Sequence, residues 1–245
     1  MDVAINLFKN PKLKSPILIQ GFPGAGLVGT ISSLYLVEKL KMEFVGYIYS
    51  SKFPPLAAIH NGKPYFPARV YASKKHNIYL ILSEFIIPTQ FIFPLAHEIY
   101  NFAKKHKVKK IISIGSIPRK EEKIDYQTIY GVVSTSKLLE ELEKQNIHVI
   151  REGVTTGVSS ILLSMGAMEN LEVISFLSNS ADNAIDLMAC YNLLLKLKSY
   201  LNLEFDLNEL EADAKKMEEQ MKKILQKASE HQISQKDEDA SSMYQ

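Results

Sequence analysis

Short apolar runs alternate with longer segments of helical periodicity along most of this chain, and this alternation limits the folds open to it. Short runs bounded by turn residues are typical of buried strands, whereas apolar residues every three or four positions indicate helices. The strand candidates are 17–19, 44–50, 68–72, 78–83, 110–114, 147–150 and 173–177, and the helix candidates are 27–40, 94–106, 137–145, 159–168 and 182–200. This order predicts an α/β fold, a three-layer sandwich around a largely parallel sheet.

Two turn signals lie in the first half of the chain. Asn61-Gly62 and the Lys-His-Asn sequence at 75–77 are typical of tight hairpin turns. We therefore expect the strands at 68–72 and 78–83 to form a β-rich insertion.

The last helix candidate follows a cluster of helix-capping residues. Asn179, Ser180 and Asp182 are all side chains that accept hydrogen bonds from the first amides of a helix. Asp182 and Asp186 lie one helical turn apart, so they could share a site, or one could cap the helix while the other faces solvent.

Composition excludes several classes of protein. A chain of 245 residues with 46% hydrophobic residues can bury a core as one large domain. Its 29 basic and 27 acidic residues give a net charge of +2, which offers no broad electrostatic reason to expect nucleic acid as a partner. Residues 1–10 show no signal peptide, and the apolar stretch at 85–96 is too short to span a membrane. We expect a soluble, cytoplasmic protein with no membrane association.

Cys190 is the single cysteine, so the chain can form no internal disulfide bond, as is typical of a reducing compartment. Its Leu, Met and Tyr neighbours follow a helical pattern, which predicts a buried structural thiol. The six histidines form no H-E-x-x-H motif or close pair, and no G-x-S-x-G motif is present. We therefore expect no metal site, no cofactor and no catalytic residue.

The sequence Gly-Phe-Pro-Gly-Ala-Gly-Leu-Val-Gly at 21–29, the glycine loop, falls between a strand candidate and a helix candidate. Gly21 opens it, and Gly24, Gly26 and Gly29 have the G-x-G-x-x-G spacing that brings a pyrophosphate to the start of a helix in dinucleotide-binding proteins. The alternative, which we favour, is a tight structural turn, because glycine permits positive φ and close backbone approach.

Two expected partners of a phosphate-binding loop are missing. Gly29 is followed by Thr30 and Ile31, so the lysine of a Walker loop is absent. The next strand candidate, 44–50, ends without the acidic residue that would bind a ribose. Both features weaken the nucleotide interpretation.

A second polar loop contains Thr155, Thr156, Gly157 and Ser159. Because the carboxyl ends of strands converge in α/β proteins, these residues could line a cleft together with the glycine loop. This supports an alternative function, a small-molecule-binding or hydrolytic enzyme that uses both loops.

Apolar residues beyond position 203 follow a heptad pattern. The seam consists of Leu207, Leu210, Ala214, Met217, Met221, Ile224 and Ala228. Alternating steps of three and four predict a helix with a narrow apolar stripe. Its partner could be another helix of the same chain or a copy of itself in an oligomer.

The final residues, 233–245, are mostly polar and predict a flexible tail. The tail ends in Met243, Tyr244 and Gln245, which places a hydrophobic residue and a tyrosine beside the terminal carboxylate. The chain thus divides into a domain at 1–203, a helix at 204–232 and a tail at 233–245.

Several short motifs in this order resemble the proteasome assembly chaperone 2 family, particularly its archaeal members. They are the glycine loop, Phe53-Pro54-Pro55, Arg69-Val70-Tyr71, the 111–115 strand that ends in glycine, and Gly-Val-Thr-Thr-Gly-Val-Ser at 153–159. The resemblance spans about 17–200. The sequence departs from the family pattern at 178–180, where many relatives have an acidic residue. This departure puts in doubt the binding of a small molecule by residues 178–180.

The resemblance implies a nucleoside-phosphorylase-like fold without the established chemistry of those enzymes, and a role in binding proteasome subunits. Met243, Tyr244 and Gln245 then look like the hydrophobic-tyrosine-any motif that docks between α-subunits of the proteasome core particle. A homo-oligomer would deliver several such tails together. We therefore expect a non-enzymatic, ATP-independent assembly chaperone homologue or activator.

Overall fold

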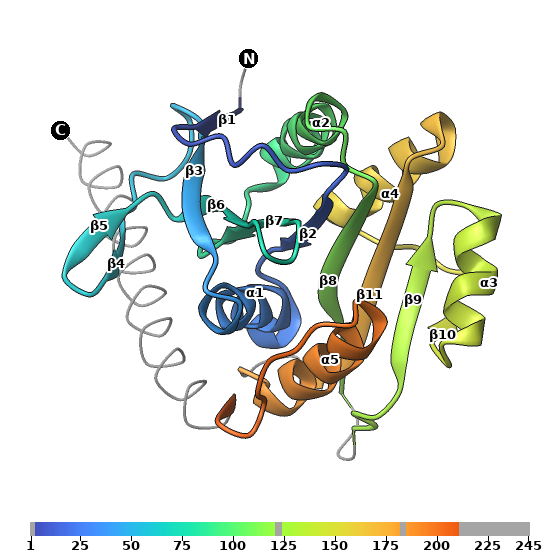
Figure 1. The fold of residues 1–245 in the computed structure, drawn as a ribbon. Helices are drawn as coiled ribbons and strands as arrows, with labels where there is room; N and C mark the ends of the chain where they lie inside the picture. Colours follow the sequence, from blue (N-terminus) through green and yellow to red (C-terminus); the bar gives the residue numbers. More distant parts are fainter. Residues whose placement is uncertain (1–2, 121–123, 182–184, 211–245) are drawn as a thin grey trace, which may run out of the picture.

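Within the part of the chain that the structure describes, nine strands form one sheet in the order β1-β3-β6-β7-β2-β8-β11-β9-β10 (Figure 1). The computed structural model describes residues 3–120, 124–181 and 185–210. The strands are β1 (Ala4–Leu7), β2 (Ile17–Gly21), β3 (Glu43–Tyr49), β6 (Ala68–Ser73), β7 (Ile78–Ser83), β8 (Lys110–Arg119), β9 (Ile129–Val133), β10 (His148–Val149) and β11 (Glu172–Ala181).

The sheet is mixed, so the expectation of a largely parallel sheet was wrong for its two sides. The central strands β7, β2, β8 and β11 are parallel, as is the short β9–β10 pair. Strands β1, β3, β6 and β7 pair antiparallel in succession, and β9 runs antiparallel to β11. The β6–β7 connection is a short hairpin, which permits only antiparallel pairing.

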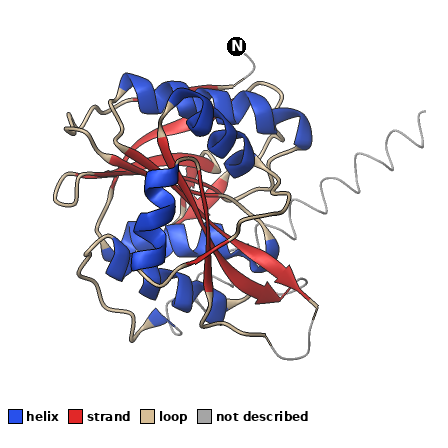
Figure 2. Ribbon diagram, turned by 90° about the vertical axis from the view of Figure 1, so that its right-hand side faces the viewer, coloured by secondary structure: helices blue, strands red, loops and turns tan. Residues whose placement is uncertain are grey.

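Helices cover both faces of the sheet and produce three layers (Figures 1 and 2). Helices α1 (Val28–Lys39) and α5 (Leu187–Tyr200) pack on one face, here called the α1/α5 face, with a core that includes Ile19 and Ile112. Helices α2 (Thr89–Lys105) and α4 (Val158–Glu169) pack on the opposite face, over Leu18 and Ile111. Helix α3 (Ser136–Lys144) contacts β9 and β10. The central strands are buried on both faces, which explains their unbroken apolar runs.

A separate two-stranded hairpin, β4 (Ala58–His60) and β5 (Lys63–Tyr65), projects beside β3 and β6 (Figure 1). Asn61 and Gly62 both have positive φ, 51° and 74°, as a two-residue hairpin turn demands. The turn prediction is confirmed here. The predicted insertion is smaller than expected, because β6 and β7 belong to the main sheet.

The cap prediction for the last helix was wrong. Asn179 and Ser180 lie inside β11, where ten consecutive register pairs with β8 hold them extended. Helix α5 begins at Leu187, and the side chain of Asp186 caps it by accepting a hydrogen bond from the Ala189 amide at 3.0 Å. Asp182 lies outside the described residues.

Cys190 is fully buried on α5, as predicted. Burial raises the pKa of its thiol to about 12. The thiol therefore stays protonated at neutral pH, which suits a packing role.

The start of the heptad seam packs on the body of the protein. Leu207 and Leu210 are buried in the core of the α1/α5 face, next to Phe205. The other seam residues and the 233–245 tail lie outside the described residues.

Candidate functional site

The glycine loop lies at the carboxyl end of β2, between β7 and β8, where ligands bind in many α/β proteins. Its backbone is folded tightly on itself. A Cβ on Gly21 would come 2.3 Å from the Gly29 carbonyl oxygen, and a Cβ on Gly29 would come 2.7 Å from the Ile114 carbonyl oxygen. These two glycines therefore let the loop, helix α1 and strand β8 approach closely.

Gly26 closes the loop against β11. Its φ is +64°, and a Cβ at this position would come 2.0 Å from the Ser180 hydroxyl oxygen. The neighbouring Ala25 carbonyl accepts a 2.5 Å hydrogen bond from Ser116 on β8. Of the four glycines in the loop, Gly24 is the one that faces open space, with no atom within 4 Å of a Cβ built on it.

Two amides where α1 begins, those of Leu27 and Val28, are already bonded within the loop. The Leu27 amide donates to the Gly24 carbonyl at 3.0 Å, and the Val28 amide donates to the Ala25 carbonyl. A phosphate site at a helix N-terminus uses amides of this kind. This geometry favours the interpretation of the loop as a structural turn over a phosphate cradle.

Asp186 joins the glycine loop to β11 and α5. Its amide donates to the Gly26 carbonyl at 3.1 Å. Its carboxylate is 5% exposed and accepts hydrogen bonds from the Ala181 amide, the Ala189 amide and the Tyr126 hydroxyl. Burial and the Asp186 charge both raise the pKa of Tyr126, so this phenol remains a donor. Asp186 is a buried structural carboxylate, not a residue on a solvated face.

The second predicted loop precedes α4, and hydrogen bonds of the described residues do not join it to the glycine loop. Thr155 and Thr156 are exposed, and Gly157, with φ +83°, precedes α4. The α4 helix covers the sheet face opposite α1. In the described part of the chain, no hydrogen bond links Thr155, Thr156 or Ser159 to the glycine loop.

A buried charged cluster was missed by the sequence analysis. Arg69 on β6 and Glu84, just after β7, form an ion pair in which each side chain is 1% exposed. His60 on β4 contacts both Glu84 carboxylate oxygens, at 2.9 and 3.1 Å. Burial, followed by the Arg69 charge, lowers the pKa of His60 to about 4, so the imidazole is neutral near pH 7. The one available signal was an arginine within a strand of mainly small and apolar residues.

The Arg69 guanidinium also lies over two tyrosine rings, 5.5 Å from the Tyr65 centroid and 5.8 Å from the Tyr71 centroid. Together these contacts hold the β4–β5 hairpin against strands β6 and β7 of the main sheet. The motif Arg69-Val70-Tyr71 thus contributes two residues, Arg69 and Tyr71, to a cluster with a structural role.

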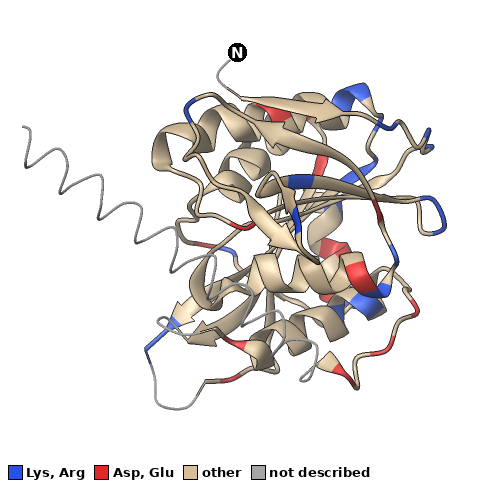
Figure 3. Cartoon of the chain, turned by 90° about the vertical axis from the view of Figure 1, so that its left-hand side faces the viewer, with Lys and Arg blue, Asp and Glu red and all other residues tan. Residues whose placement is uncertain are grey.

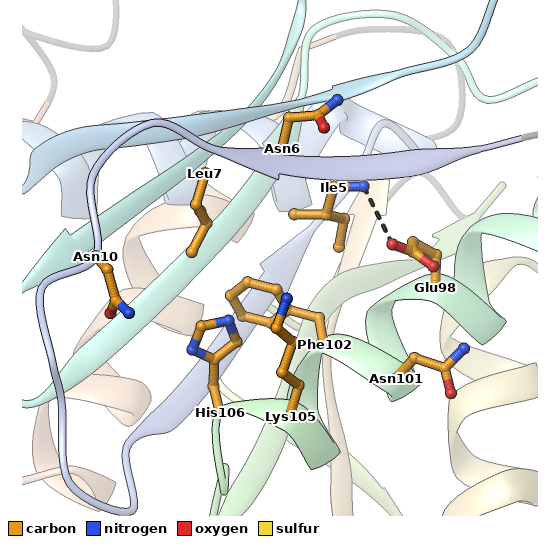
Figure 4. A pocket seen from close by; sticks show the side chains of 9 residues that line it. All are labelled: Ile5, Asn6, Leu7, Asn10, Glu98, Asn101, Phe102, Lys105 and His106. Carbon is orange, nitrogen blue, oxygen red and sulfur yellow. Dashed lines mark hydrogen bonds between the residues drawn. The ribbon is translucent and has the colours of Figure 1, made fainter.

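Two cavities lie away from the predicted residues. One of about 430 Å³ separates β1 from α2 and is shown in Figure 4, where Glu98 accepts a 3.2 Å hydrogen bond from the Ile5 amide. The other, of about 440 Å³, lies between the end of α1 and the β6–β7 turn. Neither is lined by the glycine loop or by Thr155, Thr156, Gly157 or Ser159.

The positions of basic and acidic residues are interspersed along the chain on the side of the molecule that carries β3 and the β4–β5 hairpin (Figure 3). Among residues 3–120, 124–181 and 185–210, no group of three or more His, Cys, Asp or Glu is placed to hold a metal ion. None of the described helices is long and apolar enough to cross a membrane. Met243, Tyr244 and Gln245, the predicted docking residues, lie outside the described part of the chain.

Comparison with known proteins places this architecture among solved structures. A chain of Pyrococcus furiosus PbaA, described as an archaeal homolog of proteasome-assembly chaperone, is 27% identical with a TM-score of 0.81, and the match covers 94% of this chain and 99% of that one. A Thermoplasma acidophilum protein of unknown function has a TM-score of 0.83 at 23% identity, with 92% of each chain covered. The P. furiosus proteasome activator PbaB shares the fold, with a TM-score of 0.77 at 24% identity, covering 91% of this chain and 98% of that one.

Comparison of sequences finds archaeal relatives, as the comparison of structures does. An uncharacterized protein of Methanocaldococcus jannaschii is 29% identical over 214 residues, which is 87% of each chain. The model of the PAC2 family matches residues 18–225, from β2 to beyond the last described residue. This chain therefore belongs to the PAC2 family.

Proposed function

We propose that this protein is an ATP-independent proteasome-binding protein, an assembly chaperone homologue or activator, that acts in the cytoplasm without catalysis of its own. The observation that carries the proposal is the likeness to PbaA over 94% of the chain at 27% identity. The fold by itself does not fix a function, because one fold can serve many. The residues that would carry the contact must therefore be named separately.

The proposed contact is the Met243-Tyr244-Gln245 tail, which docks into pockets between α-subunits of the core particle. Methionine fills an irregular apolar recess adaptably, and tyrosine adds a rigid ring with a hydrogen-bonding hydroxyl. The terminal carboxylate can pair with a lysine of the pocket. Docking at several α-subunit pockets is the step by which the tail would open the gate.

To dock, the tail must be long enough to enter a pocket, and several tails must act together. A flexible stalk formed by 233–245 spans roughly 20 Å by random-coil scaling, enough to let the body remain outside the pocket. A single short tail binds weakly. A homo-oligomer that presents several tails raises their effective concentration, and overall affinity then exceeds that of one tail without any new contact.

The glycine loop has no part in this contact. Close packing against Gly29, Ser180 and Ile114 accounts for Gly21, Gly26 and Gly29 respectively, whereas Gly24 faces open space. The likeness to nucleoside phosphorylases that the family resemblance implies would then be a likeness of fold and not of chemistry. No cofactor is required by the proposal.

The test is binding to archaeal proteasome core particle, together with hydrolysis of a short fluorogenic peptide by that particle. We expect the full chain to bind and to stimulate hydrolysis. Tyr244→Ala should weaken binding by roughly thirtyfold, the loss typical of a buried aromatic anchor. Deletion of 243–245 should abolish stimulation.

The matched control is Gln245→Ala, which keeps the carboxylate at its place and changes the position at which the motif tolerates any residue. It should bind as the full chain does. Equal binding and stimulation by the full chain and by the deletion variant would reject the docking tail. Absence of binding by the full chain, both to mature particles and to free α-subunits, would reject the proteasome role itself.

A further inference from the structure

A row of aromatic side chains lies along β3 on the α1/α5 face. This aromatic strip consists of Phe8, Phe44, Tyr47, Tyr49, Tyr65 and Phe66. Its rings contact one another in two groups, one around Phe44 and one around Phe66. The Phe8 and Phe44 centroids are 5.0 Å apart, Phe44 and Tyr65 are 5.4 Å apart, and Tyr47 stacks on Phe66 at 4.4 Å.

The strip is open to solvent in the described part of the chain. Phe8, Tyr49 and Phe66 are 54%, 46% and 45% exposed. Helices α1 and α5 cover the same face farther along the sheet. Strand β3 and the β4–β5 hairpin, which carry most of the strip, lie on the left-hand side of Figure 1, the side that Figure 3 turns to the viewer. Phe44, Tyr47 and Tyr65 are half-buried. Exposed apolar side chains that gather in this way are typical of a surface that makes a contact.

The described chain ends on this same face. Leu207 and Leu210 are buried in the α1/α5 core, and Tyr71, whose ring is 5.6 Å from that of Phe44, packs against that core. Two further contacts hold the end in place. The Tyr35 hydroxyl donates to the Asp206 carbonyl at 2.7 Å, and Lys39 pairs with Glu209 at 3.1 Å.

Lys39 and Glu43 line the same cavity, at the end of α1 and the start of β3. The chain therefore leaves the described structure close to the residue that precedes Phe44. A segment that continues from Leu210 therefore starts near the Glu43 end of β3, the strand that carries the strip.

The sequence after Leu210 supplies a matching apolar stripe. Leu207 and Leu210 are the first two positions of the heptad seam, and both already pack on their own chain. The seam continues with Ala214, Met217, Met221 and Ile224. A helix over 211–228 would be roughly 27 Å long, and β3, with seven residues, is roughly 24 Å long. The PAC2 family match also runs to residue 225, so this segment belongs to the family's common region.

We propose that residues 211–228 of this same chain cover the aromatic strip, with Met217, Met221 and Ile224 against Tyr47, Tyr49 and Phe66. Thioether sulfur packs favourably at the edges of aromatic rings, and methionine adapts to an irregular surface. The docked segment fixes the point on the body from which 233–245 departs. This inference does not depend on proteasome binding, and its test contains no proteasome.

The test uses thiol labelling of the full chain. Cys190 is fully buried, so an introduced Tyr49→Cys is the reporting thiol. We expect slow labelling in the chain with its seam intact. Adding Met217→Lys and Met221→Lys should accelerate labelling on the order of tenfold, because two charges cannot be buried against the strip.

Two controls keep the result specific. Glu219→Lys with Gln226→Lys adds two lysines at positions opposite the seam and should leave the rate slow. Met168→Cys, 85% exposed on α4, should label at one fast rate in every variant, which reports that the body stays folded.

Labelling of Tyr49→Cys that is equally fast with the intact seam and with the two seam lysines would overturn the proposal. Slow labelling that is lost on dilution, together with a dimeric mass, would also overturn it, because the covering segment would then come from a second copy. Slow labelling of Tyr49→Cys chains that persists when they are assembled with an excess of chains carrying the two seam lysines supports it, in a monomer or in an oligomer, because each strip is then covered by its own chain.

Discussion

The backbone of Gly26 lies so close to the side chain of Ser180 that a Cβ at position 26 would come 2.0 Å from the hydroxyl oxygen. This contact closes the turn after β2 onto the end of β11. It gives the middle glycine of the G-x-G-x-x-G spacing a packing role. The glycine spacing therefore reflects the close approach of the loop, β8 and β11. The absence of a Walker lysine and of a ribose-binding acidic residue is consistent with this packing role.

Gly26→Ala should lower the free energy of unfolding by about 2–4 kcal/mol. Part of the loss comes from a left-handed φ in a residue with a Cβ, and part from overpacking against Ser180. Urea denaturation of the full chain measures it. Gly24→Ala is the matched control, since nothing lies within 4 Å of a Cβ there, and it should change stability by less than about 1 kcal/mol. Equal losses in both variants would contradict the packing explanation.

Glu84→Gln should destabilise the protein by about 3–5 kcal/mol, because it leaves Arg69 charged and buried without its counter-ion. The variant that combines Arg69→Met with Glu84→Gln should recover much of that loss, since the uncompensated charge is gone. Urea denaturation of both variants distinguishes a paired charge from simple packing. A double variant no more stable than Glu84→Gln would show that the ion pair is not the cause.

Asp186→Ala should cost about 2–4 kcal/mol, the sum of a lost helix cap and of buried donors left unpaired. The donors are the Ala181 and Ala189 amides and the Tyr126 hydroxyl. Asp125→Ala is a control at an exposed turn and should cost less. Hydrogen exchange provides a second measurement, because the first amides of α5 should lose protection in Asp186→Ala and keep it in the control.

Cys190 should be inert to thiol reagents at pH 8 in the folded protein and reactive in urea. Its pKa is raised to about 12 by burial, so the folded protein keeps the thiol proton at pH values where the unfolded chain loses it. This group therefore has no effect on stability below about pH 8, and lowers the free energy of unfolding as pH rises above about 8.5. Comparison with Cys190→Ala at pH 7 and pH 10 isolates the thiol, and the variant should show a smaller fall. Rapid labelling of folded protein at pH 8 would contradict the assignment.

Local patterns predicted most elements of the fold. The runs around 17–19, 78–83 and 110–114 became buried central strands because both faces of each are covered, which removes polar alternation. Strands β1 and β9 were missed, since each is short and half-buried and has no strong apolar run. Asn61-Gly62 fixed its hairpin turn because only residues that tolerate positive φ fit it.

Sequence by itself determined the layered α/β class, the buried state of Cys190 and the absence of a Walker lysine. Strand direction, the cap at Asp186 and the burial of Arg69 against Glu84 were decided by tertiary structure. The physical reason is common to all three. Each depends on which distant segments meet, and Asn179 or Ser180 could cap a helix as well as Asp186 until ten register pairs with β8 hold them in a strand.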